Sequence, residues 1–379
     1  MNSTVSSICF INPSTAWKTI GGAEVQIRLL AEEALRRGLK VMYVTRPDQI
    51  PDAEETDSGI KFHPFSETGD PKKDLASFTR LLTEIDADIY YQRGRKLWTW
   101  FTGEFSVRSG KPFIYAASMD LDCRRRKFLF RRSGSWYAHW KNIRNLSSDY
   151  RLDHRTLQGI RNASLVLSQT ETQKKLFLKN LGIRSSVFTN LHPIPPPDSF
   201  QKDSPPVVLW LASVKRWKQP GLFLQLARDL RHLDCRFVLA GRLADREFEP
   251  ILEQAERDLE HFSWIRDVPF ERSNDLMGRA SLFVNTSRME EGFPNTYIQS
   301  WLRNTPTVTL HFDPDGIIER ENIGASAGGE YRNLQEHVSG FIQDRERRLY
   351  AGESARKYAR VSHGLEENMD RFITLISSL

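Results

Sequence analysis

The stretch with the clearest chemistry is 290-EEGFPNTYIQSW-301, which follows an apolar run at 280–285. The apolar run is typical of a buried strand, and the apolar residues within 297–302 recur at helical spacing. A loop between such a strand and helix is a place where α/β proteins bind ligands. Glu290 and Glu291 would repel a phosphate but would accept hydrogen bonds from sugar hydroxyls, so they predict contact with a sugar.

Two glycine-containing turns could present backbone amides to an anion. In the first, Gly292 permits close backbone approach and Pro294 suits a first helical turn, so the amides of 292–295 would face a phosphate or sugar. In the second, Gly21 and Gly22 precede an amphipathic helix. A plain tight turn explains this second pair equally well. Neither turn is a GxGxxG or Walker A motif, so the sequence does not support the usual dinucleotide or nucleoside-triphosphate site.

A basic loop follows the apolar run at 207–213. Its residues Lys215, Arg216 and Lys218 would place positive charge where a leaving phosphate develops negative charge. Arg242 follows another apolar run and could join them. A solvated loop is the alternative interpretation.

An Asp-x-Asp triplet, Asp120 and Asp122, follows the apolar run at 112–118. Such a triplet can hold a divalent metal that carries a nucleotide diphosphate. The spacing arises easily by chance, and the chain repeats it at 86–88 and 313–315. We therefore expect no metal and no cofactor, and we expect Asp120 to position an acceptor hydroxyl.

The segment between Cys123 and Ser148 contains eight Lys and Arg and no acidic residue, with aromatic residues between them. This mixture suits an anionic membrane surface or a lipid-linked phosphate. Nucleic acid would use the same charges, but no nucleic-acid-binding motif accompanies them. We expect a membrane or lipid-acceptor contact, with a solvated, partly ordered loop as the alternative. The residues assigned to this contact are Arg124, Arg125, Arg126, Lys127, Trp136 and Trp140.

Strands and helices must position these residues, and the sequence alternates between the two patterns. Apolar, β-rich runs separated by helical patterns are typical of parallel sheets covered on both faces. The pattern restarts after a proline-rich join at 193–206, which predicts an α/β fold of two Rossmann-like domains facing an interdomain cleft. The strands are expected at 7–11, 40–45, 88–91, 112–118, 164–169, 207–213, 236–241, 281–285 and 306–310.

Length and composition agree with two soluble domains. For 379 residues, of which 39% are hydrophobic, two domains of roughly 150–200 residues are expected. The net charge of +6 favours an acidic partner. No apolar run has the roughly 20 residues of a membrane-spanning helix, and the N-terminal residues lack signal-peptide features. The three cysteines form no CxxC pair, so we expect a cytoplasmic protein, attached peripherally to the inner face of the membrane.

Together, these motifs resemble the family 4 retaining glycosyltransferases, which have the GT-B fold. The resemblance covers nearly the whole chain in order, and its most specific part is 291-EGFPNTYIQSWLRNTPTV-308. Serine-hydrolase and zinc-protease patterns are absent. The other segments that carry the resemblance are GGAE at 21–24, 168-SQTETQKKLF-177, 190-NLHPIPPP-197, 213-SVKRWK-218 and 237-FVLAG-241.

The resemblance implies roles for individual residues. It makes Glu291 the donor-sugar residue and Lys218 the diphosphate-binding lysine. It places two groups of backbone amides near sugar and phosphate. These belong to the N-terminal loop of Gly21 and Gly22, and to the loop of Gly292, Phe293, Pro294 and Asn295.

Three positions depart from the pattern of the family. Gln299 stands where the family has an acid that binds the ribose. Ser213 stands where it has a phosphate-binding arginine, so that Arg216 or Lys215 would substitute. Residues 118–120 stand where it has a histidine at the end of the fourth strand of the N-terminal domain.

The resemblance implies a retaining glycosyltransferase that moves a sugar from a nucleotide diphosphate sugar to a glycan or polyprenyl-linked lipid acceptor, in cell-surface polysaccharide synthesis. It implies an acceptor-binding domain at 1–198, a nucleotide-sugar-binding domain at 199–362 and a helix at 363–379 that crosses back to the first domain. Two rival functions stay open. One is a non-catalytic relative that binds a nucleotide or glycan as a scaffold, and the other is a nucleotide-sugar epimerase of the same architecture.

Overall fold

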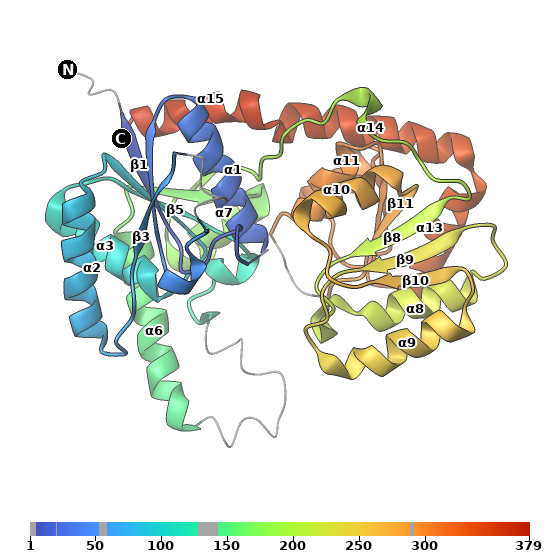
Figure 1. Ribbon diagram of the computed structural model, residues 1–379, viewed down its shortest axis with the longest axis horizontal. Coiled ribbons are helices and arrows are strands. Elements are labelled where there is room, and N and C mark those ends of the chain that lie inside the picture. The colour runs from blue at the N-terminus through green and yellow to red at the C-terminus, as the bar shows by residue number, and fades with distance from the viewer. Residues whose placement is uncertain (1–4, 20, 53–58, 128–142, 289–291) are drawn as a thin grey trace. The chain divides into compact units, whose positions relative to one another are not determined.

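The computed structural model describes residues 5–19, 21–52, 59–127, 143–288 and 292–379. The chain divides into two compact units, which we call unit 1 (Met1–Leu191 and Leu365–Leu379) and unit 2 (His192–Gly364) (Figure 1). The observed boundary lies between Leu191 and His192, whereas the boundary expected from the sequence, at 198/199, lies further along the chain within the proline-rich join. The start of this join belongs to unit 2 because Arg356 Nη2 donates a hydrogen bond to the carbonyl oxygen of Pro195 at 2.9 Å.

Within the described residues, unit 1 is built on a seven-stranded parallel sheet in the order β3-β2-β1-β4-β5-β6-β7. The strands are β1 (Ser7–Ile11), β2 (Lys40–Thr45), β3 (Lys61–Pro64), β4 (Ile89–Arg93), β5 (Phe113–Ala116), β6 (Leu165–Ser168) and β7 (Ser186–Val187). The helices that accompany them are α1 (Gly22–Arg36), α2 (Pro71–Ile85), α3 (Leu97–Ser109), α6 (Ile143–Arg161), α7 (Glu171–Leu181) and α15 (Leu365–Ser377).

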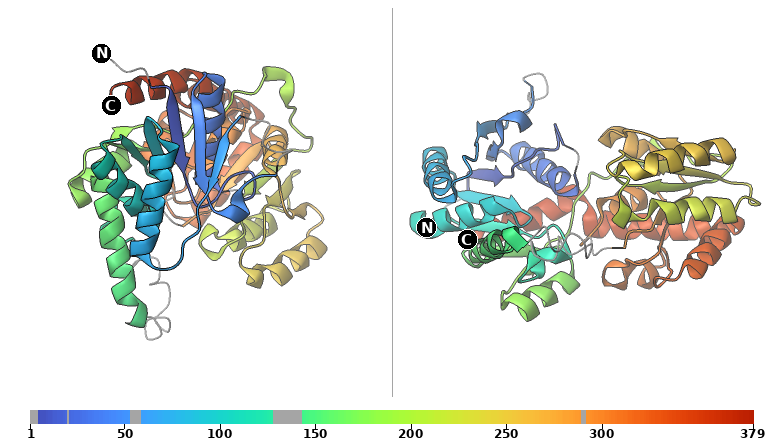
Figure 2. Two further views of the ribbon diagram at one scale, coloured as in Figure 1. Left: turned by 60° about the vertical axis from the view of Figure 1, so that its left-hand side comes forward. Right: turned by 90° about the horizontal axis from the view of Figure 1, so that it is seen from below.

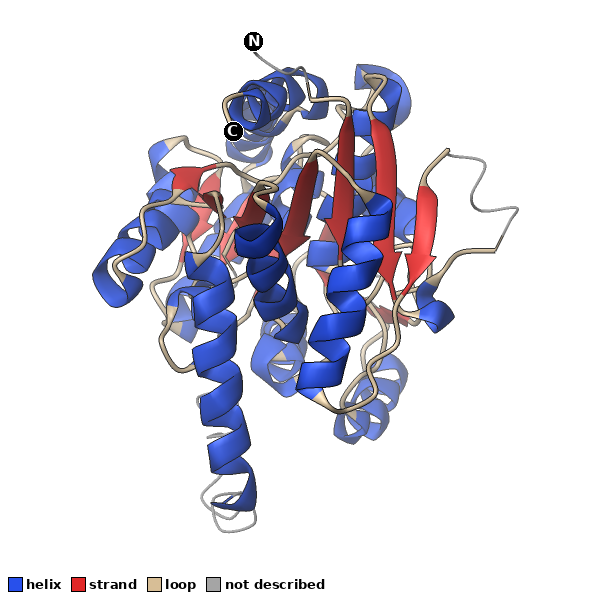
Figure 3. Ribbon diagram, turned by 90° about the vertical axis from the view of Figure 1, so that its left-hand side faces the viewer, coloured by secondary structure: helices blue, strands red, loops and turns tan. Residues whose placement is uncertain are grey.

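Alternate residues of β1 face opposite sides of this sheet, because successive side chains of a strand point in opposite directions. Ile8 and Phe10 pack among apolar residues of α1 and α15. Cys9 and Ile11 pack among those of α2 and α3. Helices therefore cover both faces of the sheet, which explains why β1 is buried along its whole length (Figure 3).

The last helix, α15, belongs to unit 1 although the preceding 173 residues of the chain form unit 2. Its apolar residues Met369, Phe372 and Ile376 are buried with those of α1, and the two helices lie side by side (Figures 1 and 2). An ion pair between Arg37 and Asp370 joins their surfaces. The chain thus closes unit 1 with residues from both of its ends.

Unit 2 repeats the architecture, and its described residues form a six-stranded parallel sheet in the order β10-β9-β8-β11-β12-β13. The strands are β8 (Val207–Leu211), β9 (Arg236–Ala240), β10 (Phe262–Ile265), β11 (Leu282–Asn285), β12 (Thr307–Thr309) and β13 (Gly324–Ser326). The helices are α8 (Pro220–Asp229), α9 (Glu249–Asp258), α10 (Phe270–Arg279), α11 (Asn295–Trp301), α12 (Ile317–Arg320), α13 (Tyr331–Gln343) and α14 (Arg345–His363).

The nine strands expected from the sequence are all present, within a few residues at each end. In both sheets the order of the strands reverses at one point, between β1 and β4 in unit 1 and between β8 and β11 in unit 2. Doubly wound sheets bind ligands outside the carboxyl ends of the strands at such a reversal point. The loops that follow these four strands are therefore the parts of the fold in which to look for a site.

Candidate functional site

In unit 2, the loops after β8 and β11 are bonded to each other. The indole Nε1 of Trp210 donates to Oγ1 of Thr286 at 2.9 Å, and this hydroxyl donates to the carbonyl oxygen of Lys218 at 2.7 Å. The amide of Arg288 donates to the carbonyl oxygen of Trp217 at 2.9 Å. Because Thr286 is fully buried, it fixes the backbone of Lys218 against the end of β11.

Positive side chains gather at this edge of the unit 2 sheet. Lys218 is partly exposed, and Arg288 is exposed at the start of the loop that follows β11. In the described part of the chain, the Arg288 guanidinium makes neither an ion pair nor a hydrogen bond. Burial lowers the pKa of His311, at the end of β12, and the charge of Arg288 lowers this pKa further. The sequence pointed to Lys218, but it did not single out Arg288, because one arginine in a loop carries no pattern.

Arg216, by contrast, has its charge paired at the surface. Its Nε and Nη2 donate to the two carboxylate oxygens of Glu247 at 2.9 and 2.6 Å, and its amide donates to Asp245 at 2.7 Å. The Arg216 side chain is 79% exposed, so the pair is screened by water and contributes little stability. A ligand would have to compete with Glu247 for this guanidinium.

The loop that precedes α11 offers backbone rather than side chains. Gly292 has φ of 75°, a left-handed conformation that suits glycine, and Gly292, Phe293 and Pro294 are all buried. The ring of Phe293 packs against Trp301 with a centroid separation of 5.8 Å. Pro294 is the residue before the helix, and α11 begins at Asn295. Glu290 and Glu291, the residues with the most specific predicted role, lie outside the described residues.

Gln299 lies on α11 and is directed toward α10. Its Nε2 donates to Oδ1 of Asn274 at 3.0 Å and to Oγ of Ser273 at 3.4 Å, and the residue is 4% exposed. The carboxamide nitrogen is thus already engaged inside unit 2. The contact of Gln299 with a ribose stays a prediction. To make it, Gln299 would use its carboxamide oxygen, or its nitrogen would have to leave Asn274 and Ser273.

In unit 1, polar residues from the loops after β1 and β4 surround Glu24, near the start of α1. Its carboxylate accepts hydrogen bonds from Ser14 at 2.8 Å and Asn12 at 3.1 Å, and Lys96 lies at 3.5 Å. Burial by itself raises the pKa of Glu24, but Lys96 and these hydrogen bonds outweigh it and hold the pKa below its usual value. Glu24 is therefore a largely covered carboxylate, 13% exposed, that stays ionised.

Gly21 and Gly22, the predicted phosphate-binding pair, lie beside this cluster. Gly21 precedes the first residue of α1, and a Cβ at Gly21 would lie 2.3 Å from Oε2 of Glu24. A larger residue there would displace a carboxylate that three side chains hold in place. The sequence interpretation gave no role to Lys96, which belongs to no recognisable pattern, or to the side chain of Glu24, although Glu24 ends the GGAE segment at 21–24.

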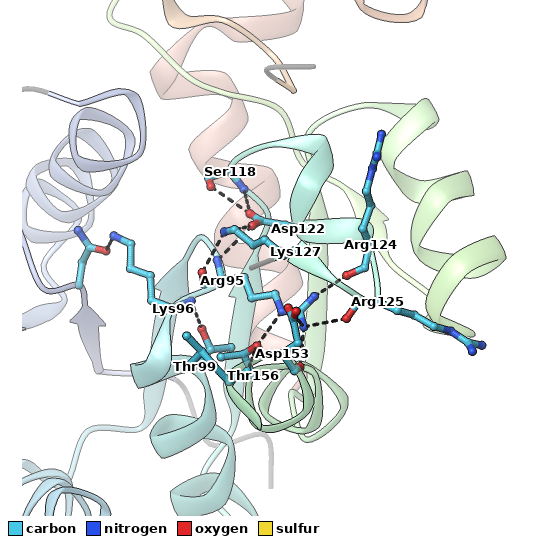
Figure 4. A network of polar contacts seen from close by, with 12 residues as sticks. Arg95, Lys96, Thr99, Ser118, Asp122, Arg124, Arg125, Lys127, Asp153 and Thr156 are labelled. Atoms are coloured by element: carbon cyan, nitrogen blue, oxygen red, sulfur yellow. Dashed lines mark hydrogen bonds and ion pairs between the residues drawn. The ribbon is translucent and has the colours of Figure 1, made fainter. Parts of the chain in front are cut away.

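The two aspartates that follow β5 are held by the protein. Asp120 accepts a hydrogen bond from Nε2 of Gln173 at 2.8 Å and is buried. Asp122 accepts from the amide and hydroxyl of Ser118 at 2.8 and 3.0 Å, and from Nζ of Lys127 at 2.5 Å (Figure 4). Among the described residues, no cluster of three or more His, Cys, Asp or Glu could hold a metal ion. Because both oxygens of Asp122 accept from protein groups, its arrangement does not favour the Asp-x-Asp metal alternative.

Lys127 corrects one prediction from the sequence. It was assigned to a membrane or acceptor surface, but it is 7% exposed, and its ammonium donates to Asp122 and to the carbonyl oxygen of Arg95 at 2.9 Å. Moving the Lys127 ammonium into solvent would leave the carboxylate of Asp122, which is fully buried, without its cation, and a buried unpaired charge is unfavourable. Lys127 thus anchors the basic segment to the interior of unit 1.

Arg95 anchors the same segment from the loop after β4. Its guanidinium is fully buried and bonded to Asp153 and Thr156 of α6, and to the carbonyl oxygen of Arg124 (Figure 4). The remaining assigned residues lie nearer the surface. Arg125 Nε donates to the carbonyl oxygen of Asn180 at 2.8 Å, and Arg126 lies 4.1 Å from the centre of the Tyr150 ring. Trp136 and Trp140 lie outside the described residues.

The chain is similar to known proteins in part of its sequence and in its fold. Residues 205–344 match the family described as Glycosyl transferases group 1. The match covers most of unit 2, including both loops that Thr286 joins. No curated protein sequence matches the chain. As far as the described residues show, no helix is long and apolar enough to cross a membrane.

Solved structures match almost the whole chain. HepE from Anabaena, in complex with UDP-glucose, is 18% identical with a TM-score of 0.71, and the match covers 98% of this chain and 100% of HepE. Sucrose-phosphate synthase from Thermosynechococcus elongatus is 13% identical with a TM-score of 0.72 over 98% of each chain. WaaG, a glycosyltransferase involved in lipopolysaccharide biosynthesis, is 14% identical with a TM-score of 0.66 over 97% of this chain and 99% of WaaG.

These matches confirm the predicted α/β fold with two Rossmann-like domains, as in GT-B glycosyltransferases. At this level of identity, likeness of structure establishes the fold alone. The family match adds that residues 205–344 of unit 2 are similar in sequence to group 1 glycosyltransferases. Membership of family 4 stays an expectation from the sequence motifs.

Proposed function

We propose that the protein is a retaining glycosyltransferase that transfers a sugar from a nucleotide diphosphate sugar to a glycan or lipid-linked acceptor. The observation that carries this proposal is the family match over unit 2, together with the position of Lys218 at the reversal point of its sheet. A leaving diphosphate needs cations and amides aimed at it, and both are present around the loops after β8 and β11.

In this proposal the chain acts mainly by positioning and by electrostatics. Lys218 contacts the diphosphate, and its backbone is fixed by Thr286. The backbone N–H groups of Gly292, Phe293 and Asn295 approach sugar and phosphate, and Glu291 accepts hydrogen bonds from the donor sugar. In unit 1, Gly21 and Gly22 approach the phosphates, and Asp120, oriented by Gln173, receives an acceptor hydroxyl.

We also propose that transfer requires no divalent metal. Lys218 and the loop amides would supply the charge stabilisation that a metal provides in other glycosyltransferases. The contacts of Asp122 with Ser118 and Lys127 agree with this, since they occupy the carboxylate oxygens that a metal would need. Activity should persist in EDTA, whereas loss of activity in EDTA and its return with manganese would contradict this part of the proposal.

For the acceptor, we propose a polyprenyl-linked or other membrane-borne glycan, in synthesis of a cell-surface polysaccharide. The support is the basic segment Arg124, Arg125 and Arg126, which follows the Asp120 loop in unit 1. Each Lys or Arg near an anionic membrane is worth about 1 kcal/mol, so reversing these three charges should release the protein from anionic vesicles. Equal binding of the reversed variant would refute the membrane contact.

The test of the proposed function is incubation of the purified chain with a panel of nucleotide sugars, with and without acceptors. Mass spectrometry would detect transfer or donor hydrolysis, and NMR would report the anomeric configuration of the product. We expect product with the configuration of the donor. Binding without any turnover would support the scaffold alternative, isomerised donor would support the epimerase, and absence of binding to any nucleotide sugar would refute all three.

A further inference from the structure

The chain passes between the two units twice, and the two passages are bonded to each other in unit 2. The first passage is Leu191 to His192, and the second is Gly364 to Leu365. The amide of His192 donates to the carbonyl oxygen of His363 at 2.9 Å, and His192 and Gly364 form a parallel β-bridge. The first and last residues of unit 2 therefore form one backbone pair.

Each passage also places an imidazole against residues 292–295, which comprise the turn before α11 and its first residue and which we call the 292–295 loop. The His192 side chain is 2% exposed and is hydrogen-bonded to the side chain of Asn295. The ring of His363 is buried and lies 4.5 Å, centre to centre, from the ring of Phe293. The His192 ring stacks on Phe270 of α10 at 6.4 Å. Two histidines that are 171 positions apart in the sequence thus contact the same four-residue loop.

Residues 192–195, which follow the first passage, are also linked to the other end of α11. Arg356 Nη1 donates to the carbonyl oxygen of Leu302, which follows the last residue of α11, at 2.8 Å, and its Nη2 donates to Pro195 at 2.9 Å. The segment 192–195 is therefore bonded to the start of α11 through Asn295 and to its end through Arg356. The two histidines of the passages are buried, and a closely packed interior transmits a displacement of one group to its neighbours.

We propose that His192 is a positioning residue, which couples the two chain passages to the 292–295 loop and so sets the conformation in which that loop binds the donor. The reference to the donor rests on the proposed function, whereas the coupling itself does not. Donor binding would then change the conformational equilibrium of the two passages, and that equilibrium would change donor affinity by the same free energy, because coupling between two sites is reciprocal.

The primary test is hydrogen exchange of the full-length protein with the substitution His192→Phe. Phenylalanine keeps a ring against Phe270 but cannot bond Asn295. We expect peptides covering 292–302 and 360–366 to exchange about tenfold faster, on the order of the effect of losing one hydrogen bond. The matched control is His261→Phe, which removes a bond to the carbonyl oxygen of Ala227 and should leave both peptides unchanged.

A second variant, Asn295→Ala, tests the same contact from the other side. It should accelerate exchange of the 360–366 peptide while His192 remains in place. In the double variant, exchange should be no faster than in the more affected single variant, since both substitutions remove one contact. Unchanged exchange of the 360–366 peptide in Asn295→Ala would overturn the proposal, and this result decides even if His192→Phe fails to fold. Fully additive effects in the double variant would overturn it as well.

The link to the donor is tested by titration with UDP and UDP-glucose. We expect His192→Phe to weaken nucleotide-sugar binding by about tenfold at temperatures well below its melting transition, with His261→Phe close to wild type. Equal affinity of wild type and His192→Phe would refute the positioning role. If the wild type binds neither probe nor any other nucleotide sugar, the proposed function fails, and the exchange experiment still decides whether the coupling exists.

Discussion

His192 should make the stability of unit 2 fall in mild acid. Burial lowers the pKa of His192 from 6.5 to about 3, the hydrogen bond with Asn295 opposes this, and the charges of His363 and Arg303 lower the pKa further. The folded protein thus keeps this imidazole neutral, whereas the unfolded chain binds a proton as pH falls below 6.5. Stability is therefore lost from about pH 6.5 downward, and the loss is complete near the folded pKa of about 3.

The size of the effect follows from the two pKa values. At pH 5 the unfolded imidazole is protonated almost completely and the folded one hardly at all, which amounts to about 1.5 pKa units, or roughly 2 kcal/mol. The assay is urea unfolding at pH 7 and pH 5 for wild type and His192→Phe. Whatever the substitution does at pH 7, the loss between pH 7 and pH 5 should be about 2 kcal/mol smaller in the variant.

The control variant His261→Phe keeps His192 and should therefore retain the full loss between pH 7 and pH 5. Equal pH dependence in wild type and His192→Phe would refute the reasoning, because it would mean that His192 titrates alike in the folded and unfolded chains. A variant that loses more stability in acid than the wild type would contradict even the sign.

Three further predictions concern Asp122, Arg216 and Glu291. Asp122→Asn should lower the free energy of unfolding by about 3–5 kcal/mol, measured by denaturant titration, because it leaves the buried ammonium of Lys127 without its carboxylate; a loss below 1 kcal/mol would show that the pair is not buried in solution. Arg216→Ala should change the affinity for UDP-glucose less than about twofold, since Glu247 already pairs this exposed guanidinium, and a tenfold loss by titration would return Arg216 to the diphosphate. Glu291→Gln should lower kcat in a transfer assay and leave the melting temperature unchanged, because we assign this carboxylate to contacts that strengthen in the transition state; a lower melting temperature with unchanged kcat would indicate only a favourable charge near the start of α11.

The interior strands could be predicted because burial on both faces leaves a continuous apolar run in the sequence. The run at 7–11 is an example, and all five residues of β1 are buried. The strands that the sequence analysis missed, β3, β7, β10 and β13, are the edge strands of the two sheets. In β3 (Lys61–Pro64) both terminal residues are exposed, and β7 has only two residues, so neither leaves an apolar run of detectable length.

Site residues could be predicted where topology alone decides their position. Lys218 and Asp120 follow predicted strands, and the carboxyl ends of parallel strands meet at one edge of a sheet. The pairing of charges could not be predicted in this way. Lys127 stands in a run of basic residues that looks solvated, and its burial depends on Asp122 and Arg95, which only the folded unit brings to it.

The central claim, that unit 2 binds the nucleotide diphosphate of a sugar donor through Lys218, is tested most directly by calorimetric titration with UDP and UDP-glucose. We expect wild type to bind and Lys218→Ala to bind at least about tenfold more weakly, since a charge-assisted contact to phosphate is worth roughly 1.5–3 kcal/mol. Lys357→Ala, which removes an exposed lysine of α14, should bind like wild type. Equal affinity of Lys218→Ala and wild type would contradict the account.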